Sequence, residues 1–124
     1  MTTESLMMEK HVKNAHMGNH LLIEVYNVPF DKLNDKEKIE QVCENACKTE
    51  GLKVLNTYTH QFDPYGVSCT ISLAESHLCC HTWPEKQCVA IDIFTCGAKN
   101  PRCVGWWILE YFDSDDYVMN DYAR

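Results

Sequence analysis

The order of hydrophobic and polar positions along the chain predicts a mixture of strands and helices. Short runs rich in β-formers, several with period-two alternation, cover residues 21–28, 52–62, 67–73, 77–83, 87–95 and 117–120. In residues 67–73 the hydrophobic side chains alternate with serine and threonine. One face of that strand is therefore expected to be buried and the other to be polar.

Apolar positions at three- and four-residue spacing predict two helices, one from residue 35 to about residue 50 and one over residues 102–112. Asn34 or Asp35 can cap the first helix, and Gly51 is a suitable stop because glycine accepts positive φ. The expected buried faces are Ile39, Val42, Cys43, Ala46 and Cys47 in the first helix and Val104, Trp107, Ile108 and Tyr111 in the second.

The resulting order, β-α-β-β-β-β-α-β, predicts an α+β fold. We expect a two-layer sandwich in which a mostly antiparallel sheet carries two helices on one face. The other face must be buried by something else, and a dimer whose sheets pack face to face would bury it. Residues 18–124 suit a single domain. Residues 1–17 are polar, lack the apolar centre of a signal peptide and are expected to be a flexible leader.

Composition narrows the classes of function. The formal charge is −7, from 18 acidic and 11 basic residues, which argues against a nucleic-acid or anionic-membrane binder because both need a basic face. No apolar run approaches the length of a membrane span. Eight cysteines would suggest disulfides in a secreted protein. Without a signal peptide, we expect reduced thiols, mostly in the core, and a cytoplasmic location.

Residues 74–85 concentrate more reactive groups than a structural strand needs: one serine, two histidines, two cysteines and two glutamates. His77, Cys79, Cys80 and His81 are possible zinc ligands, but no paired Cys-x-x-Cys is present. On a strand, Cys80 would also face away from the other three. A Ser–His or Cys–His nucleophile is equally weakly supported, because neither Gly-x-Ser-x-Gly nor a catalytic-cysteine motif occurs.

A third possibility is self-processing at the bond between Glu75 and Ser76. The serine hydroxyl can attack the preceding carbonyl to give an ester. Elimination then leaves dehydroalanine, which hydrolyses to a pyruvoyl group. This chemistry needs a strained Xaa–Ser bond, a donor for the oxyanion and a base. His81, and Ser68 on the preceding strand, are candidates to assist Ser76.

Several motifs decide between these possibilities. They are Gly18-Asn19-His20-Leu21, residues 60–68 (HQFDPYGVS), Glu75-Ser76-His77, residues 81–85 (HTWPE) and residues 91–97 (IDIFTCG). With these motifs in this order, the sequence resembles the pyruvoyl-dependent S-adenosylmethionine decarboxylases of the short bacterial and archaeal type. The resemblance implies autocatalytic cleavage into a β chain of residues 1–75 and an α chain of residues 76–124 that begins with a pyruvoyl group made from Ser76. It implies no metal.

The resemblance also implies residue roles. His81 would assist processing, Ser68 would support processing and the active site, and Cys96 would donate a proton during catalysis. Phe62 would stack on the adenine of the substrate, and Glu85 would contact the substrate. The pyruvoyl carbonyl would form a Schiff base with the substrate amine and delocalise the charge left by carbon dioxide, as pyridoxal phosphate does elsewhere. The product would be decarboxylated S-adenosylmethionine for spermidine biosynthesis.

Two alternatives stay open from the sequence. Relatives within this family decarboxylate arginine or ornithine, and an acidic chain with Asp63 near the expected pocket suits such substrates. An unprocessed, inactive homologue acting as a binding partner is the other. In either active case we expect a homodimer of cleaved protomers, in which residues of two protomers meet at each site.

Overall fold

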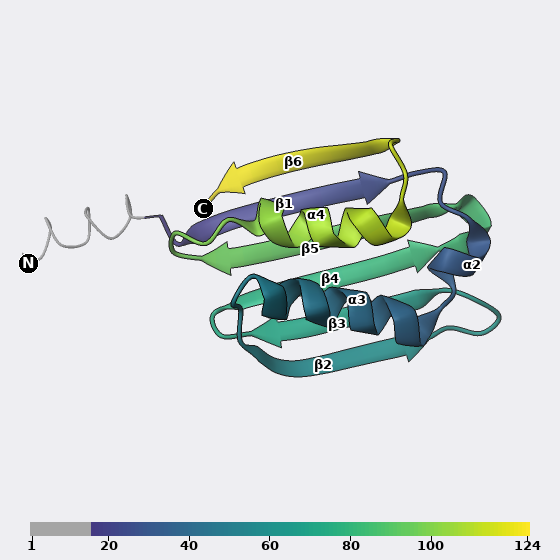
Figure 1. The fold of residues 1–124 in the computed structure, drawn as a ribbon, viewed down its shortest axis with the longest axis horizontal. Coiled ribbons are helices and arrows are strands. Elements are labelled where there is room, and N and C mark those ends of the chain that lie inside the picture. The colour runs from purple at the N-terminus through teal and green to yellow at the C-terminus, as the bar shows by residue number, and fades with distance from the viewer. Residues whose placement is uncertain (1–15) are drawn as a thin grey trace, which may run out of the picture.

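The computed structural model describes residues 16–124, so most of the expected leader lies outside the described residues. Its centre is a six-stranded sheet with strand order β2-β3-β4-β5-β1-β6 (Figure 1). Every neighbouring pair is antiparallel. The strands are β1 (Gly18–Val25), β2 (Val54–Gln61), β3 (Val67–Leu73), β4 (Ser76–Trp83), β5 (Cys88–Cys96) and β6 (Tyr117–Ala123).

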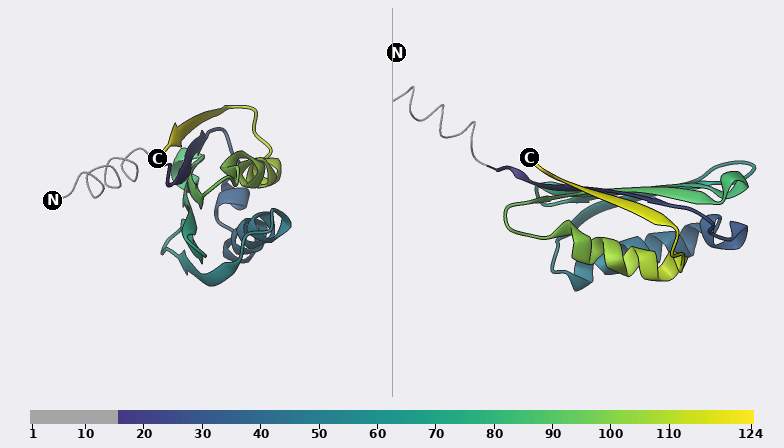
Figure 2. Two further views of the ribbon diagram at one scale, coloured as in Figure 1. Left: turned by 90° about the vertical axis from the view of Figure 1, so that its left-hand side faces the viewer. Right: turned by 90° about the horizontal axis from the view of Figure 1, so that it is seen from above.

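Two long helices, α3 (Lys36–Thr49) and α4 (Pro101–Phe112), lie side by side on one face of the sheet (Figure 2). A short helix, α2 (Phe30–Leu33), precedes α3, and a 3₁₀ turn, η1 (Pro84–Lys86), follows β4. Within residues 16–124 no helix covers the other face. The predicted α+β architecture is thus confirmed. Residues 16–124 by themselves leave one face of the sheet without a covering layer.

The core lies between the sheet and the helices and follows the alternation along each strand. In β3, β4 and β5 every second side chain is buried against the helices, while the intervening side chains are mostly half-buried or exposed. Large buried members are Leu21, Ile23, Ile71, Leu78 and Ile93 from the strands and Ile39, Ile108 and Phe112 from the helices. Alternation of this kind is what a sheet covered on one face produces.

The largest difference in the strands concerns the first one. Residues 21–28 were expected to form it, whereas β1 spans Gly18–Val25. Asn27 has a φ of 59°, which turns the chain out of the sheet. Val28 is nevertheless fully buried, and its N–H donates to the carbonyl of Gln87. Its hydrophobicity therefore reflects packing after the strand has ended.

The two predicted helices are present, but the buried face of α4 differs from the prediction. Trp107 was expected to point inward and is 46% exposed; its indole N–H donates to Glu50 Oε2 at 2.9 Å. Gly105 instead faces the sheet, where an added Cβ would lie 2.8 Å from Ile23 Cδ1. The buried residues of α4 are Pro101, Val104, Gly105, Ile108, Leu109 and Phe112, and Tyr111 is half-buried. The close approach at Gly105 accounts for this orientation.

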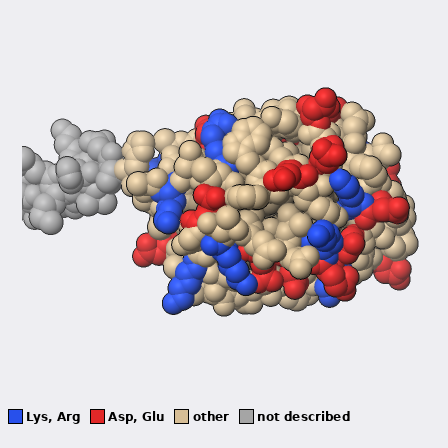
Figure 3. All heavy atoms as spheres, viewed as in Figure 1, with Lys and Arg blue, Asp and Glu red and all other residues tan. Residues whose placement is uncertain are grey.

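The distribution of charged side chains on the surface agrees with the negative net charge of the chain. Acidic and basic side chains are interspersed over the helix-covered face, with no continuous basic area (Figure 3). In residues 16–124, none of the helices combines the length and the hydrophobicity that crossing a bilayer would require.

Candidate active site

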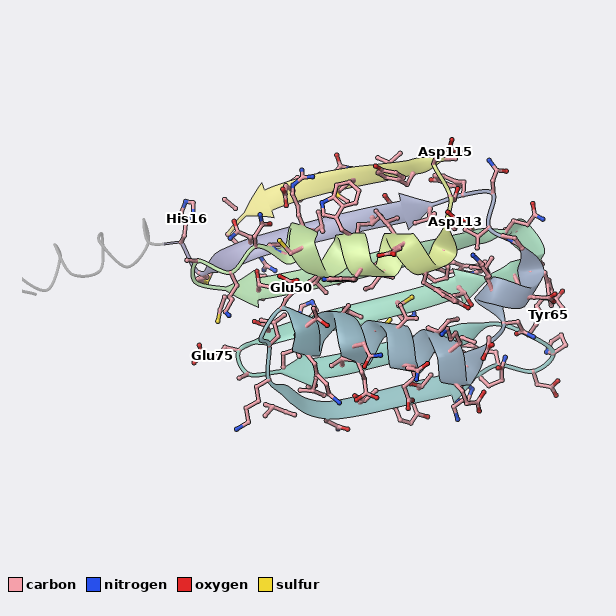
Figure 4. All side chains as sticks on the ribbon, viewed as in Figure 1. His16, Glu50, Tyr65, Glu75, Asp113 and Asp115 are labelled. Atoms are coloured by element: carbon pink, nitrogen blue, oxygen red, sulfur yellow. The ribbon has the colours of Figure 1, made fainter. Side chains whose placement is uncertain are left out.

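The expected cleavage bond lies at the tip of a tight hairpin. Only Ala74 and Glu75 separate β3 from β4. Glu75 has a φ of 59°, in the left-handed region that costs a non-glycine residue about 1–2 kcal/mol. Figure 4 labels Glu75 at one end of the sheet, on the loop that closes this hairpin. The bond to Ser76 therefore follows a residue with strained backbone, which is what cleavage chemistry at this position requires.

The side chain of Ser76 is held by the neighbouring strand. Its Oγ accepts a hydrogen bond from the backbone N–H of Cys96 at 3.1 Å. Cys96 is the last residue of β5, and both residues are half-buried. The structure therefore brings Glu75, Ser76 and Cys96 together.

A second group of expected residues gathers at the opposite end of the hairpin. Ser68 and His81 are direct cross-strand partners in β3 and β4. Ser68 Oγ and His81 Nδ1 are hydrogen-bonded at 2.7 Å, and both side chains are half-buried on the helix-free side. This contact holds the imidazole in one orientation.

Beside this pair lies a cleft of about 320 Å³. Its lining includes Phe62, Ser68, His81 and Glu85, together with Tyr65, Trp83 and the backbone around Gly66. Phe62 is 47% exposed, so its ring is available for stacking and is not part of the core. Four of the residues expected from the sequence thus share one cleft with the aromatic side chains of Tyr65 and Trp83.

Thr82 positions this end of the hairpin, and sequence reasoning missed it. The residue is buried; its Oγ1 accepts the N–H of Val67 at 2.9 Å and donates to the carbonyl of Leu33 at 2.6 Å. The hydroxyl thereby ties β3 and β4 to the end of α2. Its alternation onto the core face was the only signal in the sequence, since a buried threonine requires hydrogen-bond partners.

The two groups do not meet within one chain. Five strand positions separate Ser76 from His81 in β4, which corresponds to about 16 Å at about 3.3 Å per residue. Figure 4 labels Glu75 and Tyr65, from the two groups, at opposite ends of the sheet. Within a single chain, His81 and Ser68 therefore lie apart from Ser76, because an extended strand separates them.

The S-adenosylmethionine decarboxylase family matches residues 19–124. The chain belongs to this family. The S-adenosylmethionine decarboxylase proenzyme of Pelotomaculum thermopropionicum is 47% identical over 110 residues, which cover 88% of this chain and 87% of that protein. The proenzyme of Moorella thermoacetica is 40% identical over 109 residues, 87% of each chain.

Solved structures agree with this assignment. The crystal structure of the adenosylmethionine decarboxylase from Aquifex aeolicus superposes with a TM-score of 0.82 at 28% identity, covering 88% of this chain and 91% of that one. The Trypanosoma brucei AdoMetDC-delta26 monomer matches with a TM-score of 0.61 at 11% identity, covering 96% of this chain and 57% of that one, and so shares the fold. The prediction of a pyruvoyl-dependent S-adenosylmethionine decarboxylase proenzyme of short prokaryotic type is confirmed.

One further cluster lies on the helix-free face of this decarboxylase. Asp92 Oδ1 contacts Nε2 of His20 and lies 3.5 Å from Nε2 of His77. In the described part of the chain, these three residues form the one group with metal-ligand geometry. However, Arg124 Nη1 lies 3.4 Å from Nδ1 of His20. A guanidinium only donates, so Nδ1 accepts and Nε2 carries the proton that it donates to Asp92.

That tautomer is the opposite of the one a metal needs. A histidine that binds a metal through Nε2, the nitrogen that faces Asp92 here, offers a free lone pair there and donates its Nδ1–H to an acceptor. In the cluster, Nε2 of His20 is a donor and the group facing Nδ1 is a cation. The arrangement therefore favours a hydrogen-bonded cluster that links β1, β5 and β4.

Half of the eight cysteines are core residues, fewer than the sequence predicted. All eight, which fall within residues 16–124, are free thiols. Cys43, Cys47, Cys69 and Cys80 are buried where α3 packs on the sheet. Burial raises the pKa of Cys47 to about 12, and a hydrogen bond with Cys43, together with burial, raises the pKa of Cys69. Thiols held in the neutral form are poor nucleophiles and poor metal ligands.

The suggested zinc ligands do not surround one point. Cys80 is buried on the helix side of β4, whereas His77, Cys79 and His81 are half-buried on the other side. The predicted division of these residues between two faces is confirmed.

Proposed function

We propose that Ser76 attacks the carbonyl of Glu75 and that the chain divides there into residues 1–75 and 76–124, with residues 18–124 remaining one domain. The strained Glu75 at the hairpin tip is the observation that carries this proposal. Cleavage relieves the backbone strain of Glu75, a non-glycine residue in the left-handed region. The backbone N–H of Cys96 donates to the attacking Oγ of Ser76 at 3.1 Å. Because Oγ is the acceptor in this bond, the hydroxyl proton of Ser76 stays free to depart.

The residues present fit a pyruvoyl group derived from Ser76. When formed, this group supplies a carbonyl that condenses with the substrate amine and withdraws the electrons released with carbon dioxide. The backbone N–H of Cys96, already directed at position 76, is placed to hold an oxygen there. The thiol of Cys96 then serves as the proton donor that completes the reaction. No metal enters this chemistry.

We assign substrate binding to the cleft at the other end of the hairpin. The exposed ring of Phe62 suits stacking on adenine, and Glu85 offers a carboxylate to the substrate. The sulfonium of S-adenosylmethionine is a cation, to which aromatic side chains such as Trp83 add attraction. The free thiols favour the cytoplasm as the location, and spermidine biosynthesis is the use of the product.

A homodimer reconciles the two separated groups. The helix-free sheet face is broad and carries half-buried groups such as His77, Asp92 and Phe94. Face-to-face packing of two copies related by a two-fold axis would cover it. Such packing allows Ser68 and His81 of one copy to meet Ser76 of the other. The separation of about 16 Å within one chain is the support for this arrangement.

The test is intact mass spectrometry of purified protein under reducing, denaturing conditions. The wild type should give two fragments divided between Glu75 and Ser76, the second beginning with a pyruvoyl group. Ser76→Ala should remain one chain, whereas Ser72→Ala, at an exposed serine of the same hairpin, should be cut normally. The cut protein should release carbon dioxide from S-adenosylmethionine.

Other results would redirect the proposal. A wild-type chain that stays uncut on long incubation contradicts self-processing and favours an inactive homologue acting as a binding partner. A cut protein that releases carbon dioxide from arginine or ornithine, but not from S-adenosylmethionine, contradicts the proposed substrate.

A further inference from the structure

We propose that Asn34 is a positioning residue that holds the loop of residues 62–66 in the shape needed for substrate binding. The inference rests on the proposed function of the cleft beside Ser68 and His81. Asn34 lies in the short connection between α2 and α3, far from the cleft in sequence. Its side chain crosses to the hairpin and bonds to both arms of the loop.

The contacts are specific. Asn34 Oδ1 accepts the backbone N–H of Gly66 at 2.9 Å and the side-chain amide of Gln61 at 2.9 Å. The same Gln61 amide donates to the carbonyl of Gly66, also at 2.9 Å. Gln61 is the last residue of β2, and Gly66 precedes β3. One carbonyl oxygen therefore fastens the two ends of the loop that joins these strands.

This loop carries two aromatic walls of the cleft. Phe62 and Tyr65 both line it and are both exposed. Phe62 is linked to the anchored end directly, because its N–H donates to the carbonyl of Gly66 at 2.8 Å. Gly66 has a φ of 114°, so the chain turns there in a conformation that only glycine adopts freely. The position of the Phe62 ring thus depends on where Gly66 is held.

Asn34 ends α2, and within residues 16–124 its side chain hydrogen-bonds to Gln61 and Gly66 alone. The adjacent Asp35, and not Asn34, caps α3 by accepting the N–H of Lys38 at 3.1 Å. On the other side, the carbonyl of Leu33 is held by buried Thr82 at 2.6 Å. Anchored between these contacts, Asn34 transmits the position of the helical layer to the loop.

The expected consequence is a change in substrate affinity with little change in chemistry. Removing the side chain leaves the Gly66 N–H without its acceptor and takes away one of the two acceptors of the Gln61 amide, and the loop samples other shapes. Binding then costs the free energy of ordering Phe62 and Tyr65. Asn34 bonds to Gln61 and Gly66 and not to Ser68, Ser76 or His81, so self-cleavage should proceed. A rise in KM with kcat nearly unchanged is the corresponding kinetic pattern.

The experiment compares Asn34→Ala, Asn34→Asp and Asn34→Leu with the wild type. The matched control is Asn45→Ala, at an exposed position of α3. Asn34→Ala and Asn34→Leu should raise KM for S-adenosylmethionine about tenfold, from two lost neutral hydrogen bonds. They should also speed hydrogen exchange of the Gly66 amide. Asn34→Asp keeps the acceptor, so its KM and its hydrogen-exchange rate at the Gly66 amide should stay near the wild-type values. Asn45→Ala should change neither.

The outcomes separate this inference from the function on which it rests. Unchanged exchange at Gly66 in Asn34→Ala overturns the anchoring role, whatever the enzyme does. Faster exchange with unchanged KM, or a loss confined to kcat, overturns the link to substrate binding. A wild-type protein without decarboxylase activity overturns the proposed function, while hydrogen exchange still decides whether Asn34 holds the loop.

Discussion

At the scale of single residues, burial dominates the behaviour of the thiols beneath α3. Cys47 is fully buried, and loss of hydration raises its pKa from 9.0 to about 12. An unfolded chain releases this proton near pH 9, whereas the folded chain keeps it until about pH 12. Between these values the unfolded state binds fewer protons, so the stability contribution is complete below pH 9 and is lost as the pH rises.

We therefore predict that the free energy of unfolding falls between pH 9 and pH 11, with Cys47 contributing up to about 1.4 kcal/mol per pH unit. Urea unfolding at pH 8, 9, 10 and 11 measures this slope. Cys47→Ala should be less stable at pH 8 but should lose stability less steeply. The exposed Cys103→Ala should keep the wild-type slope. Equal slopes for Cys47→Ala and the wild type would contradict the assignment.

Single residues also mark the limit of sequence reasoning at the site. Family motifs pointed to Ser68 and His81, and the structure joins them at 2.7 Å. Nothing in those motifs pointed to Asn34, because its partners are a backbone N–H and an amide brought near only by folding. Of two adjacent capping candidates, the sequence could not say that Asp35 would cap the helix and Asn34 would turn to the hairpin.

At the scale of elements, the strands were predictable because one covered face imposes strict alternation. Residues 67–73 gave the observed bounds of β3, and the limits of β4 and β5 differ from prediction by one residue. The elements that were missed, α2 and η1, are too short to show a helical period. The outward Trp107 was missed because hydrophobicity alone does not tell which face of an apolar helix approaches the sheet.

Gly105 sets that approach, and its substitution tests it. Alanine would favour the helix by up to about 1 kcal/mol, but its Cβ would lie 2.8 Å from Ile23 Cδ1 and 3.1 Å from Leu21 Cδ2. Overpacking of this kind costs about 1–3 kcal/mol. We predict that Gly105→Ala lowers the free energy of unfolding by about 1 kcal/mol, measured by urea denaturation.

A double substitution separates overpacking from other causes. Ile23→Val removes the Cδ1 atom that lies closest to the added methyl group. The Ile23→Val/Gly105→Ala protein should therefore lose less stability than the sum of the two single changes, because residues in contact are not additive. Additive losses would mean that the position of α4 does not depend on this contact.

At the scale of the whole molecule, the uncovered sheet face and the divided site both support the proposed homodimer. The antiparallel pairing of β4 with β5 places Ser76 and Cys96 at one end of the sheet, and the cleft with His81 lies at the other end. The sequence predicted that one face of the sheet has no helices on it, because two helices cover only the other face. It could not predict the division, because a motif records which residues occur and not how far an extended strand separates them.

Complementation between two inactive chains tests the composite site. Ser76→Ala lacks the attacking hydroxyl and His81→Ala lacks the assisting imidazole, so each chain expressed alone should remain uncut. In a mixed dimer, the intact Ser76 of the His81→Ala chain meets the intact His81 of the Ser76→Ala chain. We predict that co-expression cuts the His81→Ala chain alone, as detected by intact mass. A chain carrying both substitutions should not rescue His81→Ala. If processing used His81 of the same chain, co-expression would yield no cleavage, and the face-to-face dimer would lose its main support.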